Sequence, residues 1–173
     1  LAIIQARSAS SRLPNKVLKK INSEEILLYL YNNLKKSKLI NKIIIATSND
    51  NSDDKIEKFC INNKISLFRG SLTNVLKRFY YAALMHMPDV IVRVTGDCPL
   101  IDSKIVDKII NNHIYYNNDY TSNTLIPTYP DGMDVEVISF NTLKKTYLKA
   151  FKKYEQEHVT PYIYENKSKF KIM

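Results

Sequence analysis

The sequence predicts a three-layer α/β/α sandwich built around a mainly parallel β-sheet. Short, wholly apolar runs alternate along the chain with amphipathic segments of helical length. Apolar runs of this kind are typical of strands that are buried on both faces. The alternation requires crossover connections, which are right-handed and place helices on both sides of the sheet. A chain of 173 residues is long enough to form one domain with a sizeable core.

The first half of the chain is expected to hold three strands, each followed by a helix. The strands are residues 1–5 (LAIIQ), 42–47 (KIIIAT) and 65–69 (ISLFR). The helices run from Ser23 to about Lys36, over about 53–63, and from Ser71 or Thr73 to about Met87. Ser23 is the expected N-cap of the first helix, because two glutamates would then occupy its first turn.

The second half begins with the same alternation and then departs from it. A strand over 89–94 (DVIVRV) leads through the sharp loop 95–99 (TGDCP) to a helix from Ser103 to Tyr115, with Asp102 as its cap. Next come a short strand within 119–123, a loop with two prolines, and an alternating strand over 134–139. A helix from Asn141 to about Lys153 and a short helix kinked or begun at Pro161 complete the chain.

The net charge of +9 raises the question of a nucleic-acid partner. The lysines are scattered in pairs along the chain, which is typical of solvent-exposed faces, so no nucleic-acid partner is expected. No apolar run approaches the ~20 residues that span a bilayer, so no membrane partner is expected either. Cys60 and Cys98 have no metal-type spacing and are interpreted as reduced thiols of a cytoplasmic protein.

Arginine and glycine are rare in this sequence, so their positions indicate where the local structure requires a residue of that particular geometry. Lysine can replace arginine where only charge matters, but not where a planar two-pronged donor is needed. The arginines are Arg7, Arg12, Arg69, Arg78 and Arg93, and the glycines are Gly70, Gly96 and Gly132. Ligands of parallel sheets bind beyond the carboxyl ends of the strands. The loop 6–16, the pair Arg69-Gly70 and the loop 95–99 each follow a strand and are therefore expected at one edge.

Four groups of residues carry candidate chemistry, and most of them have a plainer alternative. The loop QARSASSRLPNK contains three cations and three serines, which suits a phosphate site or an ordinary polar connection. Asp97 suits Mg2+, because Asp102 already provides the helix cap that would otherwise explain an aspartate there. Asp134 and Glu136 share one strand face and suit sugar hydroxyls or a metal, whereas Asp131 is interpreted as a turn residue. His158 suits a substrate contact or simple packing.

Six segments together carry a more specific resemblance. They are IIQARSASSRLPNKVLKKI, FRGSLTNVLKRF, VIVRVTGDCPLID, DYTSNT, YPDGMDVEVIS and EHVTPYI, and they cover nearly the whole chain. In this order they resemble the cytidylyltransferase family, especially its spore-coat-polysaccharide type, and more distantly the CMP-KDO and CMP-N-acylneuraminate synthetases. The resemblance implies the nucleotide-diphospho-sugar transferase fold. It also implies transfer of CMP from CTP to a sugar or sugar acid, with release of pyrophosphate, in polysaccharide biosynthesis.

The resemblance also implies roles for individual residues. The implied nucleotide contacts are Ala6, Arg7, Ser11, Arg12, Lys16, Arg69, Arg78 and Gly96. The implied catalytic set is Arg12, Lys16 and Asp97, with Asp97 as the ligand of an Mg2+ cofactor. The implied sugar contacts are Asp134, Glu136 and His158. CTP and a sugar or sugar acid are the expected partners, and a homodimer is a candidate assembly.

This chain departs from the family pattern in two places. The family's first loop usually has glycines where this chain has Ala9 or Ser10, and Asn15. The family also continues to a strand with a further metal-binding aspartate, whereas this chain begins with Leu1 and stops at KFKIM. The expectation is therefore one domain over 1–173 that lacks a last strand and helix. Two alternatives stay open: a glycosyltransferase that uses a nucleotide-sugar donor, although no Asp-x-Asp motif is present, and a non-catalytic nucleotide- or sugar-binding protein.

Overall fold

The computed structural model describes residues 1–9 and 13–173 and contains eight strands within them. The strands are β1 (Ala2–Gln5), β2 (Lys20–Ile21), β3 (Glu24–Glu25), β4 (Ile43–Ser48), β5 (Ser66–Gly70), β6 (Val90–Thr95), β7 (Tyr120–Ser122) and β8 (Glu136–Ser139). The helices are α1 (Ile26–Leu34), α2 (Asp54–Asn62), α3 (Val75–Leu84), α4 (Ser103–Tyr115), α5 (Phe140–Lys149), α6 (Lys153–His158) and α7 (Pro161–Glu165). Two 3-10 turns, η1 (Lys16–Leu18) and η2 (Asn51–Asp53), precede β2 and α2.

Six strands form one sheet in the order β5-β4-β1-β6-β8-β7. The first four are mutually parallel, and Ile4 of β1 lies between Ile45 of β4 and Val94 of β6. β8 runs antiparallel to both β6 and β7. The predicted mainly parallel sheet is thus confirmed, and the change of pattern after residue 118 corresponds to the antiparallel edge.

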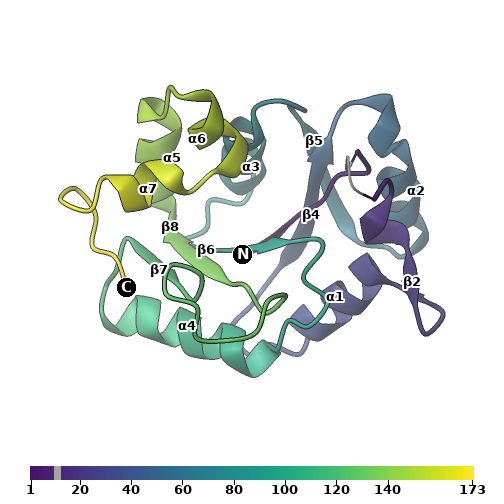
Figure 1. Ribbon diagram of the computed structural model, residues 1–173, viewed down its shortest axis with the longest axis horizontal. Coiled ribbons are helices and arrows are strands. Elements are labelled where there is room, and N and C mark those ends of the chain that lie inside the picture. Colours follow the sequence, from purple (N-terminus) through teal and green to yellow (C-terminus); the bar gives the residue numbers. More distant parts are fainter. Residues whose placement is uncertain (10–12) are drawn as a thin grey trace.

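Helices cover both faces of this sheet, so the predicted three layers are also confirmed (Figure 1). One core cluster joins the strands to α1, α2 and α4, and the other joins them to α3, α5 and α7. Side chains of β1 alternate between the two cores: Ala2 and Ile4 face the first, and Ile3 faces the second. All three are fully buried, as the uninterrupted apolar run predicted.

The predicted start of the first helix is wrong. Asn22 and Ser23 have φ angles of 49° and 71° and connect β2 to β3, which form a small antiparallel hairpin. Two consecutive residues with positive φ are the signature of a tight hairpin turn, and asparagine tolerates this conformation better than most residues. The two glutamates predicted to lie in the first helical turn therefore form β3, and α1 begins only at Ile26.

Other element boundaries follow from local capping. Asp102 caps α4 as predicted, because its carboxylate accepts hydrogen bonds from the backbone N–H groups of Lys104 and Ile105. Asn74, rather than Ser71 or Thr73, caps α3. Helical structure is interrupted between α6 and α7, and α7 begins at Pro161. Over the described residues, no helix is both long and apolar enough to cross a membrane.

Candidate functional site

The loops that follow β1 and β6 meet at the carboxyl edge of the sheet and line a cavity of ≈ 520 Å³. Its lining residues are Gln5, Arg7, Leu13, Lys16, Val17, Arg93, Thr95, Gly96, Asp97 and His158. The two strands are adjacent and parallel, so the chain necessarily delivers both loops to one place. The predicted convergence of loop 6–16 with loop 95–99 is therefore observed.

Lys16 and Asp97 form an ion pair across this cavity, with 3.0 Å between Nζ and Oδ2. Burial acts to raise the pKa of Asp97, but the hydrogen bonds from Lys16 and Thr95 and the positive charge of Lys16 together outweigh it and hold that pKa below its ordinary value. Both side chains remain roughly 40% exposed, at 39% and 45%, so water and a ligand can reach them. The pair therefore presents a cation and an ionised carboxylate at the cavity wall.

Gly96 lets the two loops approach closely. Its N–H donates to the carbonyl oxygen of Gln5 at 2.8 Å. A Cβ at this position would lie 3.2 Å from the Ala6 Cβ, the Gln5 carbonyl oxygen and a Val17 methyl group. This rare glycine thus marks a position where a side chain would push the Asp97 loop away from the first loop.

Asp53 holds the first loop in place through a hydrogen bond to its backbone. It is fully buried, and its carboxylate accepts hydrogen bonds from the backbone N–H groups of Ser8 (2.6 Å) and Ser48 (3.0 Å) and from the Ser48 hydroxyl (2.5 Å). Burial acts to raise the pKa of Asp53, but these hydrogen bonds hold it below its ordinary value of 3.8. Asp53 is therefore a positioning residue that fixes Ser8 just before the part of the loop expected to contact phosphate.

Asp53→Ala is expected to lower the free energy of unfolding by about 1–3 kcal/mol for each buried donor left without a partner. Because the folded-state pKa of Asp53 is lowered, the advantage of the wild type is full above pH 3.8 and is lost as the pH falls through the folded-state pKa. Urea unfolding of both proteins at neutral pH and at successively lower pH measures this. A stability difference that does not shrink on acidification contradicts the ionised role of Asp53.

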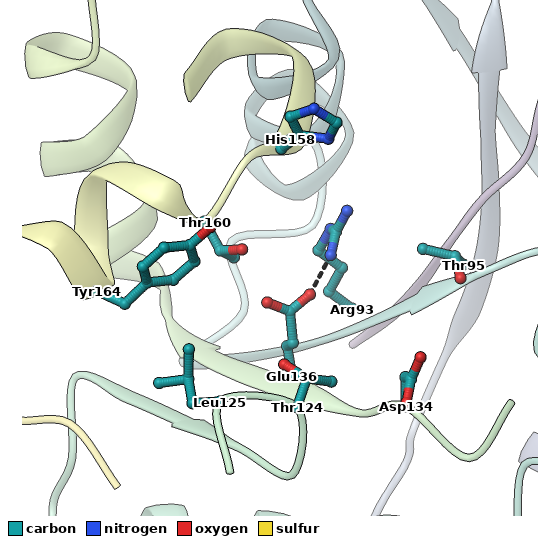
Figure 2. Close-up of a pocket in the computed structure, with 9 residues that line it drawn as sticks. All are labelled: Arg93, Thr95, Thr124, Leu125, Asp134, Glu136, His158, Thr160 and Tyr164. Atoms are coloured by element: carbon teal, nitrogen blue, oxygen red, sulfur yellow. Dashed lines mark hydrogen bonds and ion pairs between the residues drawn. The ribbon is translucent and has the colours of Figure 1, made fainter. Parts of the chain in front are cut away.

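A second cavity, of ≈ 350 Å³, adjoins the first, and Figure 2 shows the residues that line it. Its lining residues are Arg93, Thr95, Thr124, Leu125, Asp134, Glu136, His158, Thr160 and Tyr164. Three of them, Arg93, Thr95 and His158, also line the larger cavity, so the two spaces share a wall. A ligand in one cavity would lie beside a ligand in the other.

Arg93 and Glu136 form a buried ion pair at the base of the smaller cavity (Figure 2). They lie opposite each other on the neighbouring strands β6 and β8. The second Arg93 amino group donates to the Gln5 side-chain oxygen at 3.0 Å, and the Tyr120 hydroxyl donates to Glu136 at 2.5 Å. This network fixes the cavity base and pairs the two charges, while the buried Nε of Arg93 has no hydrogen-bond partner among the described residues.

The structure brings most predicted site residues together. Arg7, Lys16, Gly96 and Asp97 line the larger cavity, and Asp134 and Glu136 line the smaller one, while His158 lines both. Ala6, the first residue of loop 6–16, is buried and lines neither cavity. Ser11 and Arg12 lie outside the described residues. The assignments of these residues to nucleotide or sugar stay predictions.

Arg69 lies apart from both cavities, in a network of its own. Its guanidinium forms ion pairs with Asp54 (2.8 Å) and Glu57 (2.5 Å) of α2, and it donates to the carbonyl oxygens of Ser48 and Asp50. All its nitrogen atoms are therefore engaged by the protein. The planar guanidinium donates in two directions and so links β5 to α2, which explains why an arginine stands here. A nucleotide contact by Arg69 stays a prediction.

Arg78 is almost fully buried on α3, at 1% exposure. One of its amino groups donates to the Ser71 carbonyl oxygen at 3.0 Å, whereas Nε and the other amino group have no hydrogen-bond partner within the described part of the chain. Burial lowers the pKa of the guanidinium to about 10, although the Asp53 carboxylate acts in the opposite direction. Gly70 makes room for the stem of Arg78, because a Cβ there would lie 3.0 Å from its Cγ.

Two important residues were missed by the sequence reasoning as site residues. Arg93 was singled out only as a rare arginine within a strand, yet it lines both cavities. Its position opposite Glu136 depends on a pairing between β6 and β8, which no local pattern reveals. Asp53 was interpreted only as part of a helix start, and its contact with Ser8 joins residues 45 positions apart in the sequence.

The larger cavity offers one carboxylate that suits a divalent cation. Within residues 1–9 and 13–173, no group of three or more His, Cys, Asp or Glu side chains could hold a metal ion by itself. Asp97 does offer a reachable, ionised carboxylate in the cavity that also holds Arg7 and Lys16. Mg2+ typically binds one or two carboxylates and completes its shell with water and substrate phosphate. The residues therefore fit Mg2+ that arrives with a polyphosphate.

The chain is similar to known proteins along its whole length. The family model described as Cytidylyltransferase matches residues 1–173. An uncharacterized protein of Methanocaldococcus jannaschii is 44% identical over 172 residues, which are 99% of this chain and 70% of that protein. The spore coat polysaccharide biosynthesis protein SpsF of Bacillus subtilis is 37% identical over 177 residues, covering 99% of this chain and 72% of that protein.

Solved structures share the same architecture. A cytidylyltransferase from Leptospira borgpetersenii serovar Hardjo-bovis superposes with a TM-score of 0.93 at 38% identity, over 99% of this chain and 73% of that one. A CMP:2-keto-3-deoxy-manno-octonic acid synthetase complexed with CTP gives a TM-score of 0.72 at 15% identity, over 99% of this chain and 87% of that one. The latter likeness concerns the fold alone.

Proposed function

The chain belongs to the cytidylyltransferase family, and we propose that it transfers CMP from CTP to a sugar in an Mg2+-dependent reaction. The observation that carries the proposal is the pair of adjoining cavities at the carboxyl edge of the sheet. The larger one has Arg7 and Lys16 in its wall and suits a triphosphate. The smaller one has hydroxyl and carboxylate groups that suit a sugar.

The reaction is a single displacement at phosphorus. The acceptor oxygen attacks the α-phosphorus of CTP, and the bond from that phosphorus to the oxygen bridging the β-phosphorus breaks, which releases pyrophosphate. The acceptor hydroxyl loses its proton as the new bond forms, and His158, on the wall that both cavities share, would accept that proton. Arg7 and Lys16 would orient the phosphates and stabilise the charge that grows on the leaving group. No covalent enzyme intermediate is required.

Asp97 is the residue that would hold Mg2+, and the bound ion would neutralise charge on the phosphates. Lys16 already donates to one Asp97 oxygen, so it keeps the carboxylate ionised and oriented toward the cavity. This arrangement brings a cation, a carboxylate and substrate phosphate within reach of one another. Positioning by these fixed side chains is the main contribution that the protein makes to the rate.

The proposal is tested by CTP-dependent pyrophosphate release with a panel of sugars and sugar acids, with Mg2+ present or removed by EDTA. We expect release that requires CTP, an acceptor and Mg2+ together, and that returns when Mg2+ is restored. Undiminished release in EDTA would exclude the metal from the reaction. CTP binding without release for any acceptor would favour a binding protein instead.

A further inference from the structure

The link between α6 and α7 contains a strained backbone turn centred on Val159. This residue has φ of 73° and ψ of −53°. Among the described residues with positive φ, it is the only one with a β-branched side chain. Positive φ is a genuine outlier for such a residue, because it brings the side chain too close to the backbone. Strain of this kind persists only where the surrounding structure imposes it, and it clusters at functional sites.

The turn lies between two residues that line the proposed active site. Resting on the proposed function, we infer that Val159 is a positioning residue, whose buried side chain holds a strained γ-turn that keeps His158 on the wall between the two cavities. The Thr160 N–H donates to the His158 carbonyl oxygen at 2.9 Å and closes the turn. A hydrogen bond between residues i+2 and i, with central angles of about 75° and −65°, defines the rare and strained form of the γ-turn.

The γ-turn sends three consecutive side chains to two different places. His158 lines both cavities and Thr160 lines the smaller one (Figure 2). Val159 between them is fully buried in the core cluster that joins the sheet to α3, α5 and α7. If α6 simply continued, His158 and Thr160 would lie about 200° apart around the helix axis, because 3.6 residues make one turn. The two side chains would then point to opposite faces of the helix instead of toward one cavity.

Contacts on both sides of Val159 impose the turn. Its side chain belongs to the same buried cluster as Leu143 of α5 and Ile163 of α7, and all three are fully buried. Its N–H donates to the Glu155 carbonyl oxygen at 3.1 Å as the C-cap of α6. Thr160 has φ of −99° and ψ of −12°, although a residue before proline normally prefers an extended backbone. Two successive residues thus hold unfavourable conformations, and burial of the Val159 side chain offsets them.

Val159→Ala tests whether the buried side chain holds the turn. Alanine lacks the two methyl groups that anchor the turn in the core, but it keeps the steric penalty on positive φ. The turn should relax, and the His158 side chain should leave the shared wall. We expect the turnover number to fall at least tenfold, because a positioned general base contributes about 10²–10⁴-fold. KM for CTP should change less than twofold, because Arg7 and Lys16 still line the larger cavity. Pyrophosphate release measures both values.

Two further variants separate positioning from stability, with every assay run well below the unfolding midpoint of the variant. Val75→Ala removes the same two methyl groups from the same core cluster, but within α3. It should lower thermal stability and leave the turnover number within twofold of wild type. Val159→Thr keeps the branched shape but buries a hydroxyl, so it should lose stability and retain most of the turnover. Equal losses of turnover in all three variants, or full turnover in Val159→Ala, overturn the inference.

NMR keeps this inference separate from the proposed function, because it needs no turnover. In the wild type the Thr160 N–H should exchange slowly with solvent, since it is hydrogen-bonded within the turn. In Val159→Ala we expect this exchange to be at least tenfold faster and the His158 ring signals to shift, while the Val92 N–H in the central sheet stays protected. A wild type that releases no pyrophosphate with any acceptor loses the proposed function. Unchanged exchange and ring signals in Val159→Ala overturn the inference whatever the activity.

Discussion

Asp97→Asn is expected to lower the turnover number about 100-fold or more, the scale seen when one charge-stabilising group is removed from an active site. Asparagine preserves the size of the side chain but removes the negative charge that would hold Mg2+. The fold should remain intact, because the ion pair with Lys16 is partly exposed and such pairs contribute only about 0–1 kcal/mol. Pyrophosphate release and thermal unfolding, measured on the same preparations, check both halves of this expectation.

Asp102→Asn provides a matched control for this variant. Asp102 lies five residues further along the same segment but caps α4, and asparagine caps helices about as well as aspartate. Turnover and stability should therefore stay close to those of the wild type. Full turnover in the Asp97→Asn protein would remove Asp97 from the metal site, and equal losses in both variants would indicate a general disturbance of the loop.

Lys16→Ala is expected to weaken CTP binding by about 1.5–3 kcal/mol, the range for hydrogen bonds that involve charged groups. The Lys16 ammonium lies 3.0 Å from Asp97 and lines the cavity assigned to the triphosphate. The substitution removes a hydrogen-bond donor to the phosphates, and it also leaves the Asp97 carboxylate without its cationic partner. Calorimetric titration of CTP in the presence of Mg2+ measures the change directly.

Lys20→Ala is the corresponding control. Lys20 belongs to the hairpin strand β2, where its ammonium lies 3.7 Å from Glu25 and its side chain is largely exposed. The Lys20→Ala substitution removes the same charge from the same region of the sequence, and Lys20 lines neither cavity. If Lys20→Ala weakened CTP binding as much as Lys16→Ala, the effect would be one of overall charge, and the assignment of Lys16 to phosphate would be wrong.

The sequence predicted that the loops after the first and fourth strands of the parallel sheet would converge, because the order and direction of the strands determine where their ends lie. The apolar runs that became β1 and β6 were recognisable, and parallel neighbours must deliver their following loops to one edge. Rare residues were also informative. Gly96 stands where the two loops touch, and Asn15 adopts a left-handed conformation, with φ of 55°, at a position where the resemblance led us to expect glycine.

Long-range pairing was beyond what local patterns could predict. Arg69 and Arg93 are both two-pronged donors within strands of the parallel sheet, but Arg69 is held by α2 and Arg93 by Glu136. Nothing in their immediate sequence distinguishes these outcomes, because the partners come from other elements. Similarly, Ser23 had the residue pattern of a helix cap, and only the pairing of β2 with β3 placed it in a turn.

The most direct test of the central claim follows the α-phosphorus of CTP. The protein is incubated with Mg2+, an acceptor sugar and CTP that carries a radioactive label at the α-phosphorus, and the products are separated. The account predicts that the label appears in a CMP-sugar and that the released pyrophosphate is unlabelled. Label recovered only in unreacted CTP or free nucleotide, together with sugar transfer from a supplied CDP-sugar, would contradict the account and favour a glycosyltransferase.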